Sequence, residues 1–215
     1  IMPFGYIGQN QTKQKVKNSG VLSSFEISHL EKQGHASGTL ELIETQTISS
    51  NVAAVDFTNI KGSQYDVHFL ETINIKNATD DQQFAFRLSV GGTFDTDNDY
   101  QRAIYSLDAA GNGGESRDNN IGNIFYTLNQ GNATNEKGNG HAYFYNLHNS
   151  SKMSYITFQS TQINNNGYYK MNLGGGVYDQ TASVDGIRIF MSNSSNIASG
   201  VFKLYGIKQL WVTYD

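Results

Sequence analysis

Alternation of apolar and polar residues with a period of two is the feature that most limits what this chain can fold into. It is clearest in the run Val184–Met191, where Ile187 and its alternate neighbours are apolar and Arg188 falls on the opposite face of an extended chain. The small polar residues 192–196 then permit a reversal, and a second strand returns over about residues 200–211. Both faces of that second strand carry apolar groups, so we expect it to lie centrally in a sheet. Together the two strands are predicted to form the closing hairpin of an antiparallel sandwich.

The same alternation recurs along most of the chain. It predicts strands over residues 40–48, 52–58, 65–76 and 84–90 and, more weakly, over 103–107, 123–128, 141–147, 153–160 and 168–173. Segments rich in glycine and asparagine, such as 108–120 and 174–176, separate these strands and are expected to make the turns. Many short strands with regular turn signals predict an all-β domain over residues 37–215, an antiparallel β-sandwich or jelly roll.

The strand expected over residues 65–76 has two unlike faces. Val67, Phe69 and Ile73 alternate with His68 and Thr72. Because antiparallel sheets commonly pack one face on the core and leave the other in water, we expect the apolar set to face the core. His68 is therefore predicted to be a surface histidine.

Composition argues against several classes of partner. The chain has no cysteine, so it cannot form disulfides, use a catalytic thiol or bind a metal through thiolates. The formal net charge is −4 and the 15 Lys and Arg residues are scattered, so no nucleic-acid partner is expected. No apolar run approaches the ~20 residues of a membrane helix, so no membrane partner is expected either.

Residues 1–36 differ in character and are predicted to form an N-terminal docking arm. Ser23 and Glu26 match a capping box that begins a short helix over about residues 24–33, and Gly34 provides its stop. A helix of this length is too short to stand alone in water by the usual ~12–15 residue criterion. We therefore expect the arm to pack on a partner through its apolar residues, Leu22, Phe25, Ile27 and Leu30.

Segments near both ends of the chain resemble structural proteins of tailed bacteriophages. Gly186–Phe190 and Ala198–Lys208 are similar to the closing hairpin of β-sandwich domains in fibre, appendage and head-decoration proteins. Met2–Gly5, Ser19–Ser23 and Ser37–Glu44 are similar to the leader of virion proteins from phages of marine and cyanobacterial hosts. The resemblance implies a protein located in the virion that contacts other virion proteins and assembles as a homotrimer.

One acidic segment has the spacing of a metal site. Asp95, Asp97 and Asp99 resemble the opening of a Ca²⁺ loop, in which alternate carboxylates bind the ion. The sixth position of such a loop is expected to be glycine but is Tyr100 here. The twelfth is expected to be glutamate but is Ser106. We therefore interpret the segment as an acidic turn between strands, and we expect no metal and no cofactor.

Aromatic residues suggest a second kind of ligand. Tyr168 and Tyr169, and the run 143–145, could stack on sugars if they are exposed beside the asparagine-rich loops. The simpler interpretation, which we favour, is that alternating aromatics fill the core and the opposite face is covered by a neighbour. The run Gly174–Gly176 lacks the Lys and Ser or Thr of a phosphate loop, and a tight turn or bulge accounts for it.

The function expected from the sequence is that of a non-enzymatic structural component of a phage particle. It would dock by its arm and display the β-sandwich on the virion surface, as a tail fibre, appendage or capsid decoration. A glycan-binding module for host attachment is the alternative. A polysaccharide hydrolase is less favoured because the G-x-S-x-G and H-E-x-x-H motifs are missing, although glycosidase carboxylates meet only in space.

Overall fold

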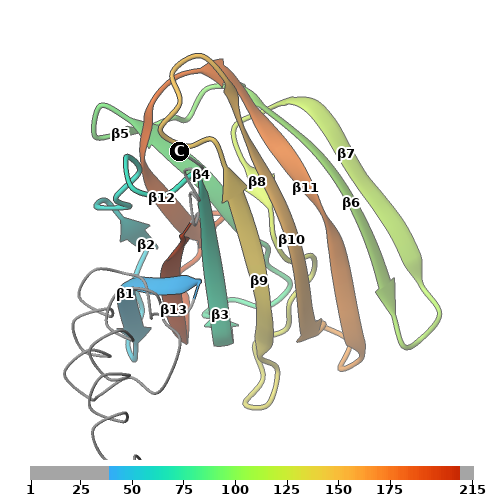
Figure 1. Ribbon diagram of the computed structural model, residues 1–215. Coiled ribbons are helices and arrows are strands. Elements are labelled where there is room, and N and C mark those ends of the chain that lie inside the picture. Colours follow the sequence, from blue (N-terminus) through green and yellow to red (C-terminus); the bar gives the residue numbers. More distant parts are fainter. Residues whose placement is uncertain (1–38, 209–215) are drawn as a thin grey trace, which may run out of the picture. The chain divides into compact units, whose positions relative to one another are not determined.

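The structure, a computed structural model, describes residues 39–208. Over this range the chain forms thirteen strands arranged in two antiparallel sheets, which confirms the predicted all-β sandwich (Figure 1). The short helix predicted over residues 24–33 and its four apolar contact residues lie outside the described range, as does Trp211 at the end of the last predicted strand.

The two sheets differ in size. The larger sheet has the spatial order β1 (Leu40–Ile48), β13 (Ile197–Ile207), β3 (Val67–Asn77), β9 (Gly138–Tyr145), β10 (Met153–Ile163), β11 (Tyr169–Thr181), β6 (Tyr100–Asp108) and β7 (Gly113–Ile121). The smaller sheet has the order β2 (Ala54–Phe57), β12 (Val184–Met191), β4 (Phe84–Val90) and β5 (Thr93–Phe94), and β8 (Ile124–Phe125) also pairs with β4. We call the side of the larger sheet that packs on the smaller sheet its inner face, and the other side its outer face.

Aromatic side chains from both sheets meet in the core. The ring of Phe86, on β4 of the smaller sheet, lies 4.9 Å from the ring of Tyr126, 5.3 Å from that of Phe144 and 6.3 Å from that of Phe158. Phe144 and Phe158 come from β9 and β10 of the larger sheet, and all four side chains are buried. Edge-to-face packing of this kind is favourable beyond the area it removes from water.

The closing hairpin predicted from the last two strands is wrong, because β12 and β13 lie in different sheets. Strand β12 pairs with β2 and β4, whereas β13 pairs with β3 and has β1 as its other neighbour. The polar segment 192–196 therefore carries the chain from one layer to the other. Alternation identified both strands, and β13 is central as expected, but alternation alone does not distinguish consecutive strands that pair from consecutive strands that face each other.

The predicted orientation of β3 is also wrong. His68, Leu70 and Thr72 are buried on the inner face, whereas Val67 and Phe69 lie on the outer face. A register shift follows Thr72, and it returns Ile75 to the core. The apolar residues of β3 were expected to face the core, yet here the outer face of the sheet is itself rich in apolar groups.

Two glycine-rich segments that were expected to be turns belong to strands. Residues 108–120 contain β7, which escapes detection because almost all its side chains are polar or absent and exposed. Gly174–Gly176 lie in the middle of β11, in regular register with both β10 and β6, so they form neither a turn nor a bulge.

Candidate ligand-binding groove

Strand register brings small residues together on the outer face of the larger sheet. One row of paired residues crosses five strands in the order Tyr143, Thr157, Gly175, Ala103 and Arg117. Neighbouring strands lie about 4.8 Å apart, so this row is about 19 Å long. Its three central members have small side chains or none, and the outer face is therefore depressed along the row.

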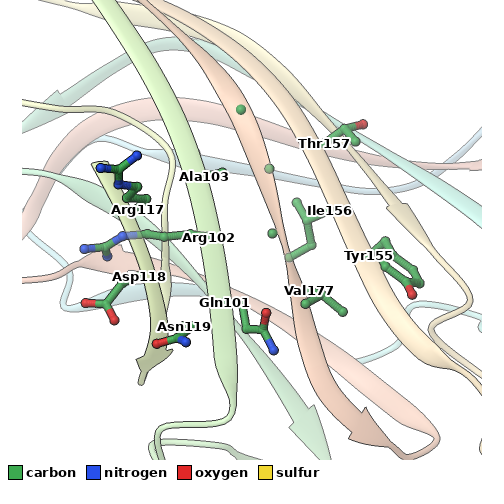
Figure 2. A pocket seen from close by; sticks show the side chains of 13 residues that line it. Gln101, Arg102, Ala103, Arg117, Asp118, Asn119, Tyr155, Ile156, Thr157 and Val177 are labelled. Atoms are coloured by element: carbon green, nitrogen blue, oxygen red, sulfur yellow. The ribbon is translucent and has the colours of Figure 1, made fainter. Parts of the chain in front are cut away.

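Larger residues line both sides of this depression. The next row on one side contains Tyr155, Val177 and Gln101, and the next row on the other side contains Leu173 and Tyr105. Beside the row of Tyr155, Val177 and Gln101 the depression forms a groove with a volume of about 900 Å³, and neither Leu173 nor Tyr105 lines it. Figure 2 shows Arg117 and Asn119 of β7 on one side of this groove and Tyr155 and Thr157 of β10 on the other. We call it the outer groove.

The three glycines of β11 allow neighbouring backbones and side chains to come close. A Cβ atom on Gly175 would lie 2.2 Å from the carbonyl oxygen of Ile156, and one on Gly176 would lie 2.7 Å from Cδ1 of Ile124. A Cβ atom on Gly174 would lie 2.5 Å from the carbonyl oxygen of Ala103. These distances are shorter than real contacts, so larger residues would displace the strands that form the groove floor.

A second, smaller pocket continues the outer groove toward β9. It has a volume of about 320 Å³, shares Thr157 and Gly174 with the groove, and is also lined by His141, Tyr143 and Gln159. Beyond Tyr143 the aromatic surface continues, because its ring lies 5.0 Å from that of Phe69. We call this smaller pocket the β9 pocket.

Four ionic side chains on the outer face form two pairs, and two further ones of opposite charge, Arg102 and Asp118, line the groove itself. Glu115 lies 3.1 Å from Arg117, and Glu71 lies 3.1 Å from the ammonium nitrogen of Lys203. The hydrogen bond from Lys203 to Glu71 raises the pKa of the lysine. Arg102 places its guanidinium 3.5 Å from the centre of the Phe125 ring in the other sheet, and burial there lowers its pKa. The groove therefore combines an apolar lining with polar ends and little net charge.

The tyrosines proposed from the sequence as glycan contacts lie elsewhere. Tyr168 and Tyr169 are 48% and 49% exposed, but they lie at the beginning of β11 and do not line the groove. At about 3.3 Å per residue, Tyr169 is about 20 Å from Gly175 along the strand. Phe144 fills the core as expected, whereas Tyr143 and Tyr145 lie on the outer face.

Sequence reasoning missed Tyr155, Gln101 and Val177 as groove residues. Each occupies an ordinary position in an alternating strand. The one local signal was the glycine run 174–176, which was interpreted as a turn. Recognising the groove required the register that places Thr157 and Ala103 beside Gly175.

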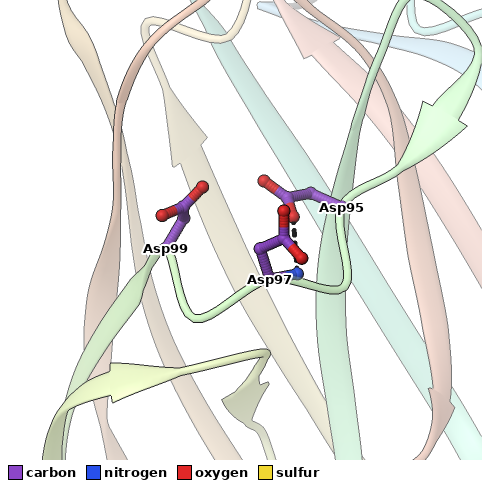
Figure 3. A group of neighbouring side chains, drawn as sticks. All are labelled: Asp95, Asp97 and Asp99. Carbon is purple, nitrogen blue, oxygen red and sulfur yellow. Dashed lines mark hydrogen bonds between the residues drawn. The ribbon is translucent and has the colours of Figure 1, made fainter.

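The acidic segment forms a compact cluster (Figure 3). One carboxylate oxygen from each of Asp95, Asp97 and Asp99 lies within 4.8 Å of the others. Asp95 accepts hydrogen bonds from the backbone N–H of Asp97 at 2.7 Å and from the hydroxyl of Tyr178 at 2.6 Å. Burial, followed by the bond to Asp95, raises the pKa of Tyr178. One oxygen of Asp95 thus closes the turn locally, and the other ties the loop to β11.

The described histidines occupy separate environments. His68 is fully buried and its Nε2 lies 2.7 Å from the carbonyl oxygen of Ile60, so the prediction of a surface histidine is wrong. His141 lies on the outer face of β9, whereas His148 lies beyond that strand with Nδ1 3.2 Å from the Ser183 hydroxyl.

Across residues 39–208 no helix has the length and apolar character needed to cross a membrane.

Comparisons with known proteins give little further guidance. No protein-family model and no curated protein matches the chain. Among solved structures, a fructofuranosidase from Schwanniomyces occidentalis in complex with fructosylnystose is similar over 78% of this chain and 34% of that chain, with 7% identity and a TM-score of 0.20. This chain thus spans about a third of that enzyme's length. A likeness this weak carries no argument about fold or activity.

Proposed function

We propose that this chain is a non-enzymatic component of a phage particle and that its sandwich binds glycans through the outer groove. The observation that carries the binding half of this proposal is the groove itself, with its floor of small residues and a wall that contains Tyr155 and Val177. The virion half is supported by the resemblance of the leader and of the last two strands to phage structural proteins.

Sugars suit the chemistry of the groove. A sugar ring has C–H groups on its faces and hydroxyl groups around its edge, so it binds best between apolar side chains that are flanked by hydrogen-bonding groups. Tyr155 is about half exposed and offers aromatic surface, whereas Gln101, Asn119 and Arg117 provide amide and guanidinium groups. Ligand sites generally combine a mostly apolar lining with a few polar groups that fix orientation.

A glycan array tests the binding half. We expect the intact protein to bind a subset of glycans, and we expect Tyr155→Ala to weaken that binding at least about tenfold. Tyr168→Ala and Tyr169→Ala are matched controls, because they remove equally exposed tyrosines outside the groove. Loss of binding in the controls but not in Tyr155→Ala would place the glycan site where the sequence first suggested. An array with no signal would reject glycan binding.

Incorporation into particles tests the virion half. Replacing the apolar residues Phe25 and Leu30 of the arm by aspartate is expected to abolish incorporation, because each aspartate introduces a charge into a contact that buries apolar surface. Normal incorporation of that double variant would contradict docking through the arm. Release of reducing ends from a bound polysaccharide would instead favour the hydrolase.

A further inference from the structure

The outer groove and the β9 pocket form one continuous path across the sheet. They share Thr157 and Gly174, and together their lining extends from β9 to β7. At the β7 end the path reaches Arg117, whose side chain is 81% exposed. At the other end it reaches Tyr143, beyond which the outer face continues to Phe69 and Tyr205. A ligand that lies in the path can therefore extend beyond both of its ends.

The charges along this path balance. Arg117 is paired with Glu115 at one end, and Lys203 is paired with Glu71 near the other. The wall between them is formed by uncharged residues, Tyr145, Tyr155, Val177 and Gln101. An acidic polymer would meet the Asp118 carboxylate in the groove and would have to compete with Glu115 for Arg117. An uncharged polymer would not have to separate either ion pair.

From these two observations we infer that the path holds an internal stretch of a neutral, linear polysaccharide, with one set of sugars in the outer groove and the next in the β9 pocket. This inference rests on the proposed glycan binding and specifies its ligand. It also assigns two roles to the site: Tyr155 and Val177 bind the sugars in the outer groove, and Tyr143 and Gln159 bind the sugars that follow.

Chain length provides the first test. The probes are neutral cello-, malto-, xylo- and laminari-oligosaccharides, from disaccharide to hexasaccharide, measured by isothermal titration calorimetry with the full chain. In the series that binds, we expect the hexasaccharide to bind at least about tenfold more tightly than the disaccharide, since only the longer ligand reaches both pockets. Equal affinity along the series would overturn the two-pocket inference and leave glycan binding intact. No binding in any series would overturn both.

Variants in the β9 pocket provide the second test. Gln159→Ala is expected to weaken hexasaccharide binding several-fold while leaving disaccharide binding in the outer groove unchanged. Tyr143→Ala is expected to do the same, and Gln159→Ala covers the case in which loss of the tyrosine ring unfolds the protein. A variant that weakens hexasaccharide and disaccharide binding equally would contradict separate roles for the two pockets.

Charge provides the third test. Oligogalacturonides and alginate oligosaccharides of matched length are expected to bind at least about tenfold more weakly than the neutral series, and the neutral affinity is expected to change little between low and high salt. Preference for the acidic probes would overturn the inference. So would a concentration-dependent dimer that Leu173→Ala abolishes, because a second copy of the chain would then occupy the path.

Discussion

The two faces of the larger sheet are built from the same strands but differ in burial. On β9 and β10, Phe144 and Phe158 point inward and are buried against Phe86 of the other sheet. Tyr143 and Tyr155 occupy neighbouring positions on those strands and point outward, where Tyr155 remains 48% exposed. Each face therefore carries aromatic side chains, but within residues 39–208 a second sheet covers only the inner face.

The difference shows that apolar content does not by itself identify the core of a sheet. Because successive residues of a strand point to opposite faces, either face can carry apolar side chains. In this sheet aromatic side chains lie on both faces. What distinguishes the outer face is the row Thr157, Gly175 and Ala103, where small residues leave space between the rings. The glycine run serves both sides, because Gly176 also leaves room for the Ile124 side chain.

The largest test of this comparison removes one ring from the core that covers the inner face and one ring from the outer face. Phe86→Ala deletes the ring that contacts three others in the core and is expected to lower the free energy of unfolding by about 3–5 kcal/mol. Tyr155→Ala on the outer face is expected to cost less than about 1 kcal/mol, because the side chain is already half exposed. Urea denaturation measures both. Equal losses would mean that the outer face is packed as tightly as the core.

A smaller effect is expected from the glycine floor. Gly175→Ala places a Cβ atom 2.2 Å from the carbonyl oxygen of Ile156, so β10 and β11 must move apart. Strain of this kind typically costs about 1–3 kcal/mol. Gly114→Ala on β7 is the matched control, since no atom outside its own neighbours lies within 4 Å of the added Cβ. Thermal unfolding of the two variants compares them, and an unchanged midpoint for Gly175→Ala would refute the close approach of the strands.

Much of the fold was predictable because it depends on local pattern. The strands over residues 40–48, 84–90, 141–147 and 153–160 were found within a few residues of β1, β4, β9 and β10. Strand β7 was not found, because an edge strand of polar residues and glycines buries nothing and so shows no alternation. Strand β11 was cut short at Leu173 because glycine in a strand is indistinguishable from glycine in a turn without its neighbours.

Pairing and orientation were not predictable from pattern, since both depend on residues distant in sequence. The layer change between β12 and β13 and the inverted face of β3 are the two errors that follow. The groove was missed for the same reason. Thr157, Gly175 and Ala103 lie side by side only when three strands are in register. Candidate glycan contacts chosen from local aromatic content therefore fell at Tyr168 and Tyr169, outside the groove.

The smallest expected effect concerns His68, the polar residue that the inverted β3 places on the inner face. Its Nε2 must carry the proton, because Nε2 lies 2.7 Å from a carbonyl oxygen of Ile60, which accepts. Its Nδ1 is buried and accepts no hydrogen bond, so adding a proton there would create an unpaired buried charge. Burial accordingly lowers the pKa of His68 below its ordinary value of 6.5.

This lowered pKa predicts how stability depends on pH. In the unfolded chain the histidine gains a proton as the pH falls below about 6.5, whereas in the folded protein it stays neutral to lower pH. The stabilisation that neutral His68 gives to the folded state is therefore complete above that pH. It is lost as the pH falls toward the folded pKa, at no more than about 1.4 kcal/mol per pH unit for one proton.

Denaturation of the intact protein and of His68→Gln, measured at pH 7 and pH 5, isolates the effect. We expect a smaller fall in the variant, whose side chain does not titrate but retains an amide donor for Ile60. If His68→Gln and the intact protein lose stability equally on acidification, then His68 does not lie on the inner face of β3, and the orientation of that strand is the one the sequence first suggested.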